Sequence, residues 1–362
     1  KDLVAVNSQI KNMAKPKMVY AGTVHSGSGT FKGRGHVGGK PRDIFVLHRG
    51  EVTDPRDPVV PGTVPGIVSS TSHLFDLPKD HKEGDRRVAL AEWIAHKDNT
   101  LTWRSIVNRV WHYHFGRGIV DTPNDFGRIG SQPSHPKLLD WLALWFRDNG
   151  TSIKDLHRLI LNSDTYKQIS DHNIENAKID NSNQFLWRQN RRRLDAESLR
   201  DTVLFVSGKM NLKMGGPSFK DFVIEKPQHS PHYQYHKYDP DDVSTHRRSI
   251  YRFIVRSQPQ PFMDTFDCAD PSQLVDKRGE TTTALQALAL LNNQFMVKMS
   301  KNFAENVSKK SVAGAVRSAF EMAVSRIPTD GELELLNSYA KKHGLAATCR
   351  IIFNLNEFSF ID

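Results

Sequence analysis

The spacing of apolar residues constrains this 362-residue chain most strongly. From residue 85 onward they recur every three or four positions, as Trp103, Ile106, Val107 and Val110 do. This spacing places side chains on one face of an α-helix, so each helix can bury that face against its neighbours. The sequence therefore predicts a mainly α, multi-helix globular body.

Residues that begin and end helices mark the boundaries of these segments. Ser, Thr and Asp favour the N-cap and Gly favours the position after the last turn. Thr329 followed by Glu332 is a capping box. On these signals we predict helices that begin near Asp85, Thr102, Ser134, Ser152 and Asp195, and further helices over residues 247–256, 283–307, 312–325, 329–342 and 346–353.

The first eighty residues have a different pattern, rich in Gly and Pro. A glycine-rich stretch covers residues 27–39, and prolines between residues 55 and 65 favour extended backbone. We predict an irregular, partly extended arm over residues 1–80 with a strand near residues 43–48. A helical lobe follows over residues 81–210, then a long aperiodic loop over 211–246, and a C-terminal helical lobe over 247–362 packed on the first.

Lysine and arginine outnumber aspartate and glutamate by 50 to 40, which gives a formal charge of +10. That charge suits nucleic acid, an anionic polysaccharide or a membrane surface, and it also serves solubility alone. The basic residues are spread along the chain without a nucleic-acid-binding motif, so nucleic acid is not the expected partner. No apolar run approaches the roughly 18 residues of a membrane-spanning helix, so no transmembrane segment is expected.

The chain contains two cysteines, Cys268 and Cys349, and neither belongs to a CxxC pair. A cysteine zinc site and a CxxCH haem attachment are therefore excluded within this chain. No cofactor is expected here, and haem could be present only on a separate module or partner. The two thiols could pair in an oxidising compartment or stay free and buried.

Several short motifs resemble one bacterial family and occur in the same order. They are NRVW at 108–111, FGRGIV at 115–120, NDFG at 124–127, SHP with LLDWLA at 134–143, RRLDAE at 192–197, RD at 200–201, GGPS at 215–218, RRSIY at 247–251, FD at 266–267, LQAL at 285–288 and LN at 291–292. Together they resemble the planctomycete-type PSD-one domain (domain of unknown function fifteen fifty-three) over roughly residues 41–362. Ala284, where the family pattern has Pro, and Cys268 depart from it.

The resemblance implies a location and neighbours, and it implies no reaction. The family is typically secreted or periplasmic in planctomycetes and related bacteria, so we expect an extracytoplasmic protein. Its members often accompany a c-type cytochrome module, and sulfatase-like proteins are often encoded nearby. A cytochrome module, a sulfatase-like neighbour and an anionic glycan are therefore the expected partners.

Carboxylates and arginines alternate on the helix predicted to begin at Asp195. Glu197, Arg200 and Asp201 lie three and four positions apart on one face. Such groups could perform acid–base chemistry if burial separated their pKa values, and the same spacing also describes an ordinary salt-bridge cluster. We predict Glu197 or Asp125 as acid or base, and His135 or Arg200 as the group that holds substrate charge.

The aperiodic loop is rich in aromatic and basic side chains. Tyrosine faces with polar edges are typical of sugar-binding clefts, and lysine would suit sulfate or carboxylate groups. The alternative is a loop whose tyrosines pack onto the body. The predicted substrate-binding residues are His232, Tyr233, Tyr235, His236 and Lys237, with His229 and Tyr238 beside them.

Two histidines near a helix end suggest a metal site that the helix geometry opposes. His112 and His114 could join Asp121 or Asp125 around zinc, copper or iron. A spacing of two places them about 200° apart on a helix, so they face different directions. The acidic residues over 264–270 lack the alternating spacing of an EF-hand loop. No metal site is predicted.

Two functions follow from these patterns. The first is an extracytoplasmic binding or assembly domain that handles an anionic polysaccharide or docks a redox partner such as a cytochrome. The second is a hydrolase or lyase that acts on an acidic or sulfated glycan.

Overall fold

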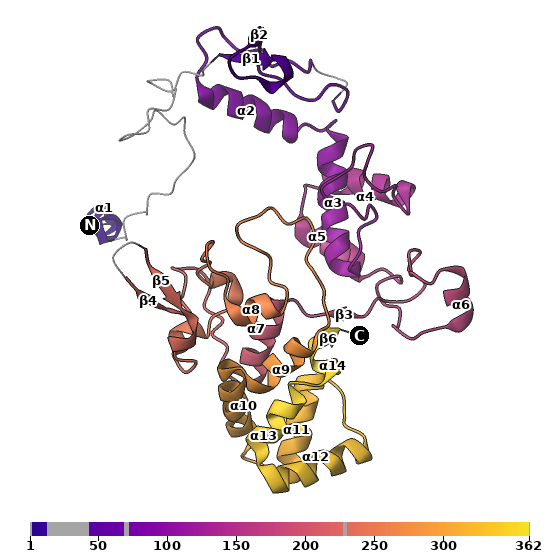
Figure 1. The fold of residues 1–362 in the computed structure, drawn as a ribbon, viewed down its shortest axis with the longest axis vertical. Coiled ribbons are helices and arrows are strands. Elements are labelled where there is room, and N and C mark those ends of the chain that lie inside the picture. Colours follow the sequence, from indigo (N-terminus) through magenta and orange to yellow (C-terminus); the bar gives the residue numbers. More distant parts are fainter. Residues whose placement is uncertain (1, 13–42, 69–71, 227–229, 362) are drawn as a thin grey trace. The chain divides into compact units, whose positions relative to one another are not determined.

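The computed structural model describes residues 2–12, 43–68, 72–226 and 230–361 (Figure 1). The structure is 47% helical and 8% strand, which confirms the predicted mainly α class. The glycine-rich stretch over residues 27–39 lies outside the described residues, as does His229. Among the residues described, no helix has both the length and the apolar character needed to cross a membrane.

The chain divides into two compact units, residues 1–106 with 143–149 and residues 107–142 with 150–362. The first contains α1 (Asp2–Asn12), β1 (Ile44–Leu47), β2 (Pro55–Val59) and α2 (Glu83–Ile94). The division falls within α3 (Thr100–Phe115) and within α4 (Pro136–Asp148).

Strands β1 and β2 form an antiparallel hairpin, with Ile44 opposite Val59 and Phe45 opposite Pro58. Strand β1 confirms the strand expected near residues 43–48. Helix α1 was not predicted.

Helix α3 begins earlier than the sequence analysis proposed. The Asn99 side chain accepts a hydrogen bond from the Thr102 amide at 3.2 Å, so Asn99 caps the helix and the prediction that Thr102 does so is wrong. Asp85 likewise lies inside α2, where its carboxylate accepts from the Lys82 amide at 2.8 Å. At the far end of α3, Gly116 adopts a φ of 76° and ends the helix, as predicted.

The second unit contains most of the helices and two pairs of short strands. Its elements are α5 (Ile153–Leu161), α6 (Ile174–Ile179), β3 (Arg192–Arg193), α7 (Ala196–Val206), β4 (Val223–Glu225), β5 (His232–Gln234), α8 (Pro261–Thr265), α9 (Ala284–Asn292), α10 (Gln294–Val307), α11 (Val312–Val324), α12 (Asp330–His343), α13 (Leu345–Ile352), α14 (Asn356–Ser359) and β6 (Phe360–Ile361). Strand β3 pairs with β6, and β4 pairs with β5, both antiparallel.

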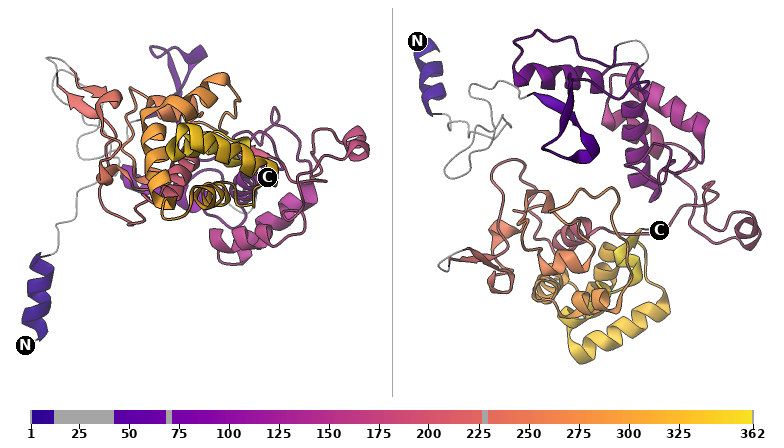
Figure 2. Two further views of the ribbon diagram at one scale, coloured as in Figure 1. Left: turned by 90° about the horizontal axis from the view of Figure 1, so that it is seen from below. Right: turned by 45° about the horizontal axis from the view of Figure 1, so that its top comes forward.

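The main hydrophobic core of this unit lies between α7 and the C-terminal helices. Leu199 and Val203 of α7, with Met299 and Phe303 of α10, are fully buried. Phe303 stacks on Phe353 just after α13, with ring centroids 5.3 Å apart. The views in Figure 2 show α10, α11 and α13 packed into one bundle. The apolar face of α7 is thereby held in the core, and its polar face contacts the neighbouring loops.

The helix predicted over residues 247–256 is wrong. This segment contains one 3-10 turn, Ser249–Tyr251, within extended backbone. Isolated β-bridges join Asn211 to Arg247 and Phe219 to Arg252. The Asp201 carboxylate accepts a hydrogen bond from the Ser249 amide at 2.8 Å. Backbone groups that form hydrogen bonds with distant residues cannot form the hydrogen bonds of an α-helix.

The segment predicted as helical over residues 283–307 consists of two helices, α9 and α10. Asn293 lies between them in extended conformation, and its side chain accepts from the Phe295 amide at 2.9 Å. Asparagine at an N-cap competes with continuous helix in this way. Helices α6 and α8 were not predicted, because both are too short to show helical periodicity.

The capping box of α12 offers a test of the helical assignment. Thr329→Ala removes the side-chain oxygen that accepts from the Glu332 amide at 3.3 Å. We expect a loss of about 1 kcal/mol in the free energy of unfolding, measured by urea denaturation. Ser338→Ala, on the exposed surface of the same helix, is the control and should cause no loss. Equal losses in both variants would contradict the capping role.

Candidate functional site

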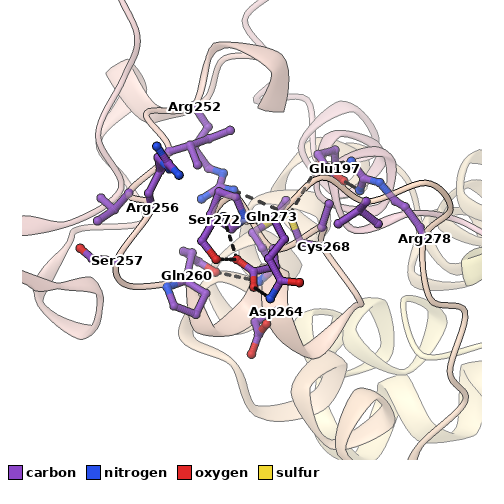
Figure 3. Close-up of a pocket in the computed structure, with 18 of the residues that line it drawn as sticks. Glu197, Arg252, Arg256, Ser257, Gln260, Asp264, Cys268, Ser272, Gln273 and Arg278 are labelled. Atoms are coloured by element: carbon purple, nitrogen blue, oxygen red, sulfur yellow. Dashed lines mark hydrogen bonds and ion pairs between the residues drawn. The ribbon is translucent and has the colours of Figure 1, made fainter. Parts of the chain in front are cut away.

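A pocket of about 580 Å³ opens in the second unit between α7, α8 and the loops around them (Figure 3). Its volume lies in the range of small-molecule sites. Figure 3 shows Arg252 and Arg256 on one side and the pair Glu197–Arg278 on another. The lining also contains the carboxylates Asp264 and Asp270 and four hydroxyl or amide side chains, those of Ser257, Gln260, Ser272 and Gln273.

Local structure fixes the elements that line this pocket. Asp195 caps α7 by accepting from the Ser198 amide, which places Glu197 in the first turn. Gln260 caps α8 by accepting from the Met263 amide at 2.7 Å, and Pro261 occupies the first position of that short helix. The pocket walls therefore rest on two capped helix starts.

Arg252 is buried without an ion-pair partner. Its residue is 9% exposed, and among the described residues its side chain has one hydrogen bond, a weak contact with the Cys268 sulfur at 4.0 Å. Its Nε is buried and has no partner. Buried guanidinium groups are normally paired, because desolvation of an unpaired charge is costly. Arg252 therefore brings an unsatisfied positive charge to the pocket.

A second arginine, Arg200, is also buried, and its hydrogen bonds are made within the protein. Arg200 donates hydrogen bonds to the carbonyls of Thr245 and Arg247, and its ion pair with Asp201 spans 3.5 Å. Asp221 is also buried here; burial raises its pKa, against the opposing charges of Arg252 and Arg200.

Glu197 is held as a carboxylate by Arg278. The two groups form a bidentate pair, with one hydrogen bond of 3.0 Å. Burial alone would raise the pKa of Glu197, but the hydrogen bonds and charge of Arg278 outweigh it and lower the pKa. The Cys268 thiol donates to Glu197 at 3.5 Å, and burial raises the pKa of that thiol to about 11. In this arrangement Glu197 orients Arg278, and the thiol stays protonated at neutral pH.

The four predicted catalytic residues occupy different surroundings, and Glu197 is the one that lines this pocket. Asp125 accepts from the Gly127 amide at 2.8 Å within its own turn. His135 contacts the Ser134 hydroxyl at 2.9 Å and the ring of Phe185. Arg200 is enclosed behind the pocket by backbone carbonyls.

The predicted substrate-binding tyrosines pack mainly against apolar neighbours. Tyr235 is buried and its hydroxyl donates to the Gln258 carbonyl at 2.9 Å, although part of its surface lines the pocket. Tyr233 meets the ring of Phe222 edge to face at 5.1 Å. With Val255 these rings form a small separate hydrophobic cluster.

The basic residues of the same hairpin lie at the surface. His232 and His236 are exposed, and Lys237 pairs with Glu225. Burial raises the pKa of the next tyrosine, Tyr238, above its usual range, against the opposing charge of Arg200. Of the five predicted binding residues, Tyr235 is the one found among the residues that line the pocket.

The two helix-end histidines face different neighbours. His114 Nε2 lies 2.7 Å from His157 Nδ1, and its ring packs against Tyr166. His112 contacts Tyr113 instead, and its Nδ1 is buried without a partner. Within the described part of the chain, no three His, Cys, Asp or Glu side chains are grouped so that they could hold a metal ion. Neither cysteine forms a disulfide.

The histidine pair predicts a pH dependence of stability. Burial, with the nearby His157 and Arg192, lowers the pKa of His114 to about 4 from an ordinary 6.5. Between these values the unfolded chain binds this proton more readily, so stability should fall as the pH falls from 6.5 to 4. His114→Gln should flatten this part of the profile, measured by urea denaturation at several pH values. His236→Gln removes an exposed histidine and should leave the slope unchanged; equal slopes in all three proteins would contradict the assignment.

The residues that dominate the pocket were missed in the sequence. Arg252, Arg256 and Arg278 lie outside regular helices, so no periodic pattern distinguishes them. The sequence feature that could have indicated the pocket is the polar run Arg-Ser-Gln-Pro-Gln over residues 256–260. Such a run in an aperiodic segment is typical of a functional loop.

The unpaired state of Arg252 can be tested through stability. Arg252→Met replaces a buried unsatisfied charge with an apolar chain of similar length, so the free energy of unfolding should rise by about 1 kcal/mol. Arg193→Met is the matched control, because the Arg193 side chain is 6% exposed and its guanidinium is paired with Asp267 at 2.6 Å. That control should lose about 3 kcal/mol. A comparable loss in Arg252→Met would show that Arg252 is satisfied.

Comparison with known proteins identifies a family. A family model described as PSD1, protein of unknown function (DUF1553), matches residues 86–340, which is most of the chain. No curated protein and no solved structure shows significant similarity to the chain.

Proposed function

This chain belongs to the PSD1 family of proteins of unknown function (DUF1553), and we propose that it is a binding domain for acidic saccharides. An acidic group, carboxylate or sulfate, is bound at Arg252 in the pocket between α7 and α8. The observation that carries the proposal is the burial of this guanidinium without an ion pair in the described structure. An anion from solution would satisfy it, because charge-assisted hydrogen bonds to a guanidinium are strong.

The rest of the lining suits a sugar ring. Amide and hydroxyl side chains such as Gln260 and Ser257 offer donors and acceptors for sugar hydroxyl groups. Arg256 adds a second positive charge near Arg252, and the chain as a whole carries +10, which favours the approach of anions. Three carboxylates also line the pocket: Glu197 is paired with Arg278, Asp270 accepts hydrogen bonds from Ser272 and Gln273, and Asp264 is exposed.

A hydrolase or lyase acting on an acidic glycan is the alternative proposal, and the pocket favours it less. A general acid needs a protonated carboxyl near neutral pH, whereas Arg278 lowers the pKa of Glu197. Binding alone requires no such proton.

The setting of this activity is also a proposal. We place it outside the cytoplasm, with a cytochrome module or a sulfatase-like protein as a neighbour, on the resemblance of the motifs alone. An acidic or sulfated glycan is the ligand that such a setting would supply.

Titration calorimetry tests the proposed binding. Galacturonic acid and glucose 6-sulfate represent the carboxylate and sulfate forms of the ligand, and glucose is the neutral control. We expect at least one acidic sugar to bind and glucose not to bind detectably. Arg252→Met should weaken acidic-sugar binding by roughly tenfold or more, because the charge-assisted hydrogen bonds are lost.

Arg317→Gln is the matched control, since it removes one positive charge from the exposed surface of α11. It should leave both affinities unchanged. Equal binding of glucose and the acidic sugars, or full affinity in Arg252→Met, would overturn the proposal.

A further inference from the structure

A second hollow of about 300 Å³ lies beside the first in the same unit. The end of α3, strand β3, the first turn of α7 and the loop before α9 line it. Cationic groups on two of these elements, β3 and the loop before α9, line it, and one of them, Arg278, also lines the first pocket. The two hollows are therefore neighbours joined by a shared guanidinium.

His112 supplies an unsatisfied polar atom at this hollow. Its Nδ1 is buried and has no hydrogen-bond partner. Burial lowers the pKa of His112, and the positive charges of Lys277 and Arg192 lower it further, against the opposing effect of Asp121. The imidazole is therefore neutral at neutral pH. A neutral imidazole can donate a hydrogen bond to a ligand or accept one from it.

Two arginines on β3 complete the positive lining. Arg192 donates to the Tyr113 carbonyl at 2.7 Å and forms no ion pair with any described residue. The stem of Arg192 lies against Gly116, where a Cβ would come within 2.7 Å of its Cδ. Arg193 pairs with Asp267, but its Nε is buried and unpaired. Two residues of the lining, His112 and Arg193, therefore each have a buried polar atom without a partner among the described residues.

The acidic side chains of this hollow are mostly occupied. Asp267 is held by Arg193 and by the Thr281 amide at 2.8 Å. Asp195 serves as the cap of α7, and Glu280 is exposed. Like Arg252 in the first pocket, Arg192 has no ion-pair partner among the described residues, although Glu280 also lines this hollow.

We propose that this second hollow is a subsite for another acidic group of the same ligand, bound by Arg192 and His112. The ligand is then an oligomer that carries acidic groups on more than one sugar unit, with Arg278 between the two bound groups. This inference rests on the proposed function of the first pocket and adds the length and charge pattern of its ligand. Two linked contacts raise affinity because the second contact forms within the bound complex.

Calorimetry with galacturonic acid and its hexamer tests this proposal. The wild-type protein should bind the hexamer roughly tenfold or more tightly than the monomer. Arg192→Gln should reduce hexamer affinity to near the monomer value and leave monomer binding unchanged. Arg252→Met should weaken both, and Arg317→Gln should change neither.

A second measurement does not depend on affinity. The imidazole resonances of His112, assigned by their loss in His112→Gln, should shift in NMR spectra on addition of the hexamer and stay unchanged with the monomer. The near-ultraviolet circular dichroism of each variant should match that of the wild type, which excludes loss of fold as the cause.

Each failure has a distinct meaning. Equal affinity for monomer and hexamer, or an Arg192→Gln variant that keeps full hexamer affinity, overturns the second subsite while the first pocket stands. Absence of monomer binding together with unchanged hexamer binding in Arg252→Met overturns the proposed function of the first pocket, and the two-site ligand with it.

Discussion

The arrangement of the pocket depends on the polar side of α7. Arg200 donates to the carbonyls of Thr245 and Arg247, and Asp201 accepts from the amide and hydroxyl of Ser249. These contacts hold an irregular segment, more than forty residues away in sequence, against a helix whose apolar face is already fixed in the core. Buried charge-assisted hydrogen bonds of this kind specify one arrangement of the backbone. Arg252 follows directly in this segment, so its place at the pocket is a consequence of the Arg200–Asp201 contacts.

The two buried arginines, Arg200 and Arg252, differ in the partners that satisfy their charge. Arg200 is enclosed by carbonyl groups, paired with Asp201 and placed over the ring of Phe219 at 5.0 Å. Arg252 has comparable burial and lacks those partners among the described residues. A satisfied buried cation contributes to the specificity of the fold, whereas an unsatisfied one lowers stability unless a ligand completes it. The contrast distinguishes Arg200, which holds two segments of the fold together, from Arg252, which has no such partners.

Much of the helical framework could be predicted from the sequence, since it depends on local signals. Caps at Ser152, Asp195 and Thr329 and the glycine stop at Gly116 act within one turn of chain, and the structure confirms them. The segment over residues 247–256 failed for the opposite reason. Its apolar spacing is helical, but its backbone bonds with Asn211, Phe219 and Asp201, which the sequence places far away.

The candidate site was less predictable, because its chemistry arises from partners that are missing rather than residues that are present. An arginine in a loop is ordinary in sequence, and Arg252 differs from the exposed Arg256 in its burial, which depends on distant contacts. Glu197 was identified from its helix position, yet its neighbours Arg278 and Cys268 come from residues about seventy to eighty positions further along the chain. The aromatic residues of the 232–238 segment show the converse: their composition resembles a sugar-binding loop, whereas Tyr233 and Tyr235 are occupied by packing on Phe222. The proposed site therefore rests on charge left unsatisfied after folding, which composition alone does not reveal.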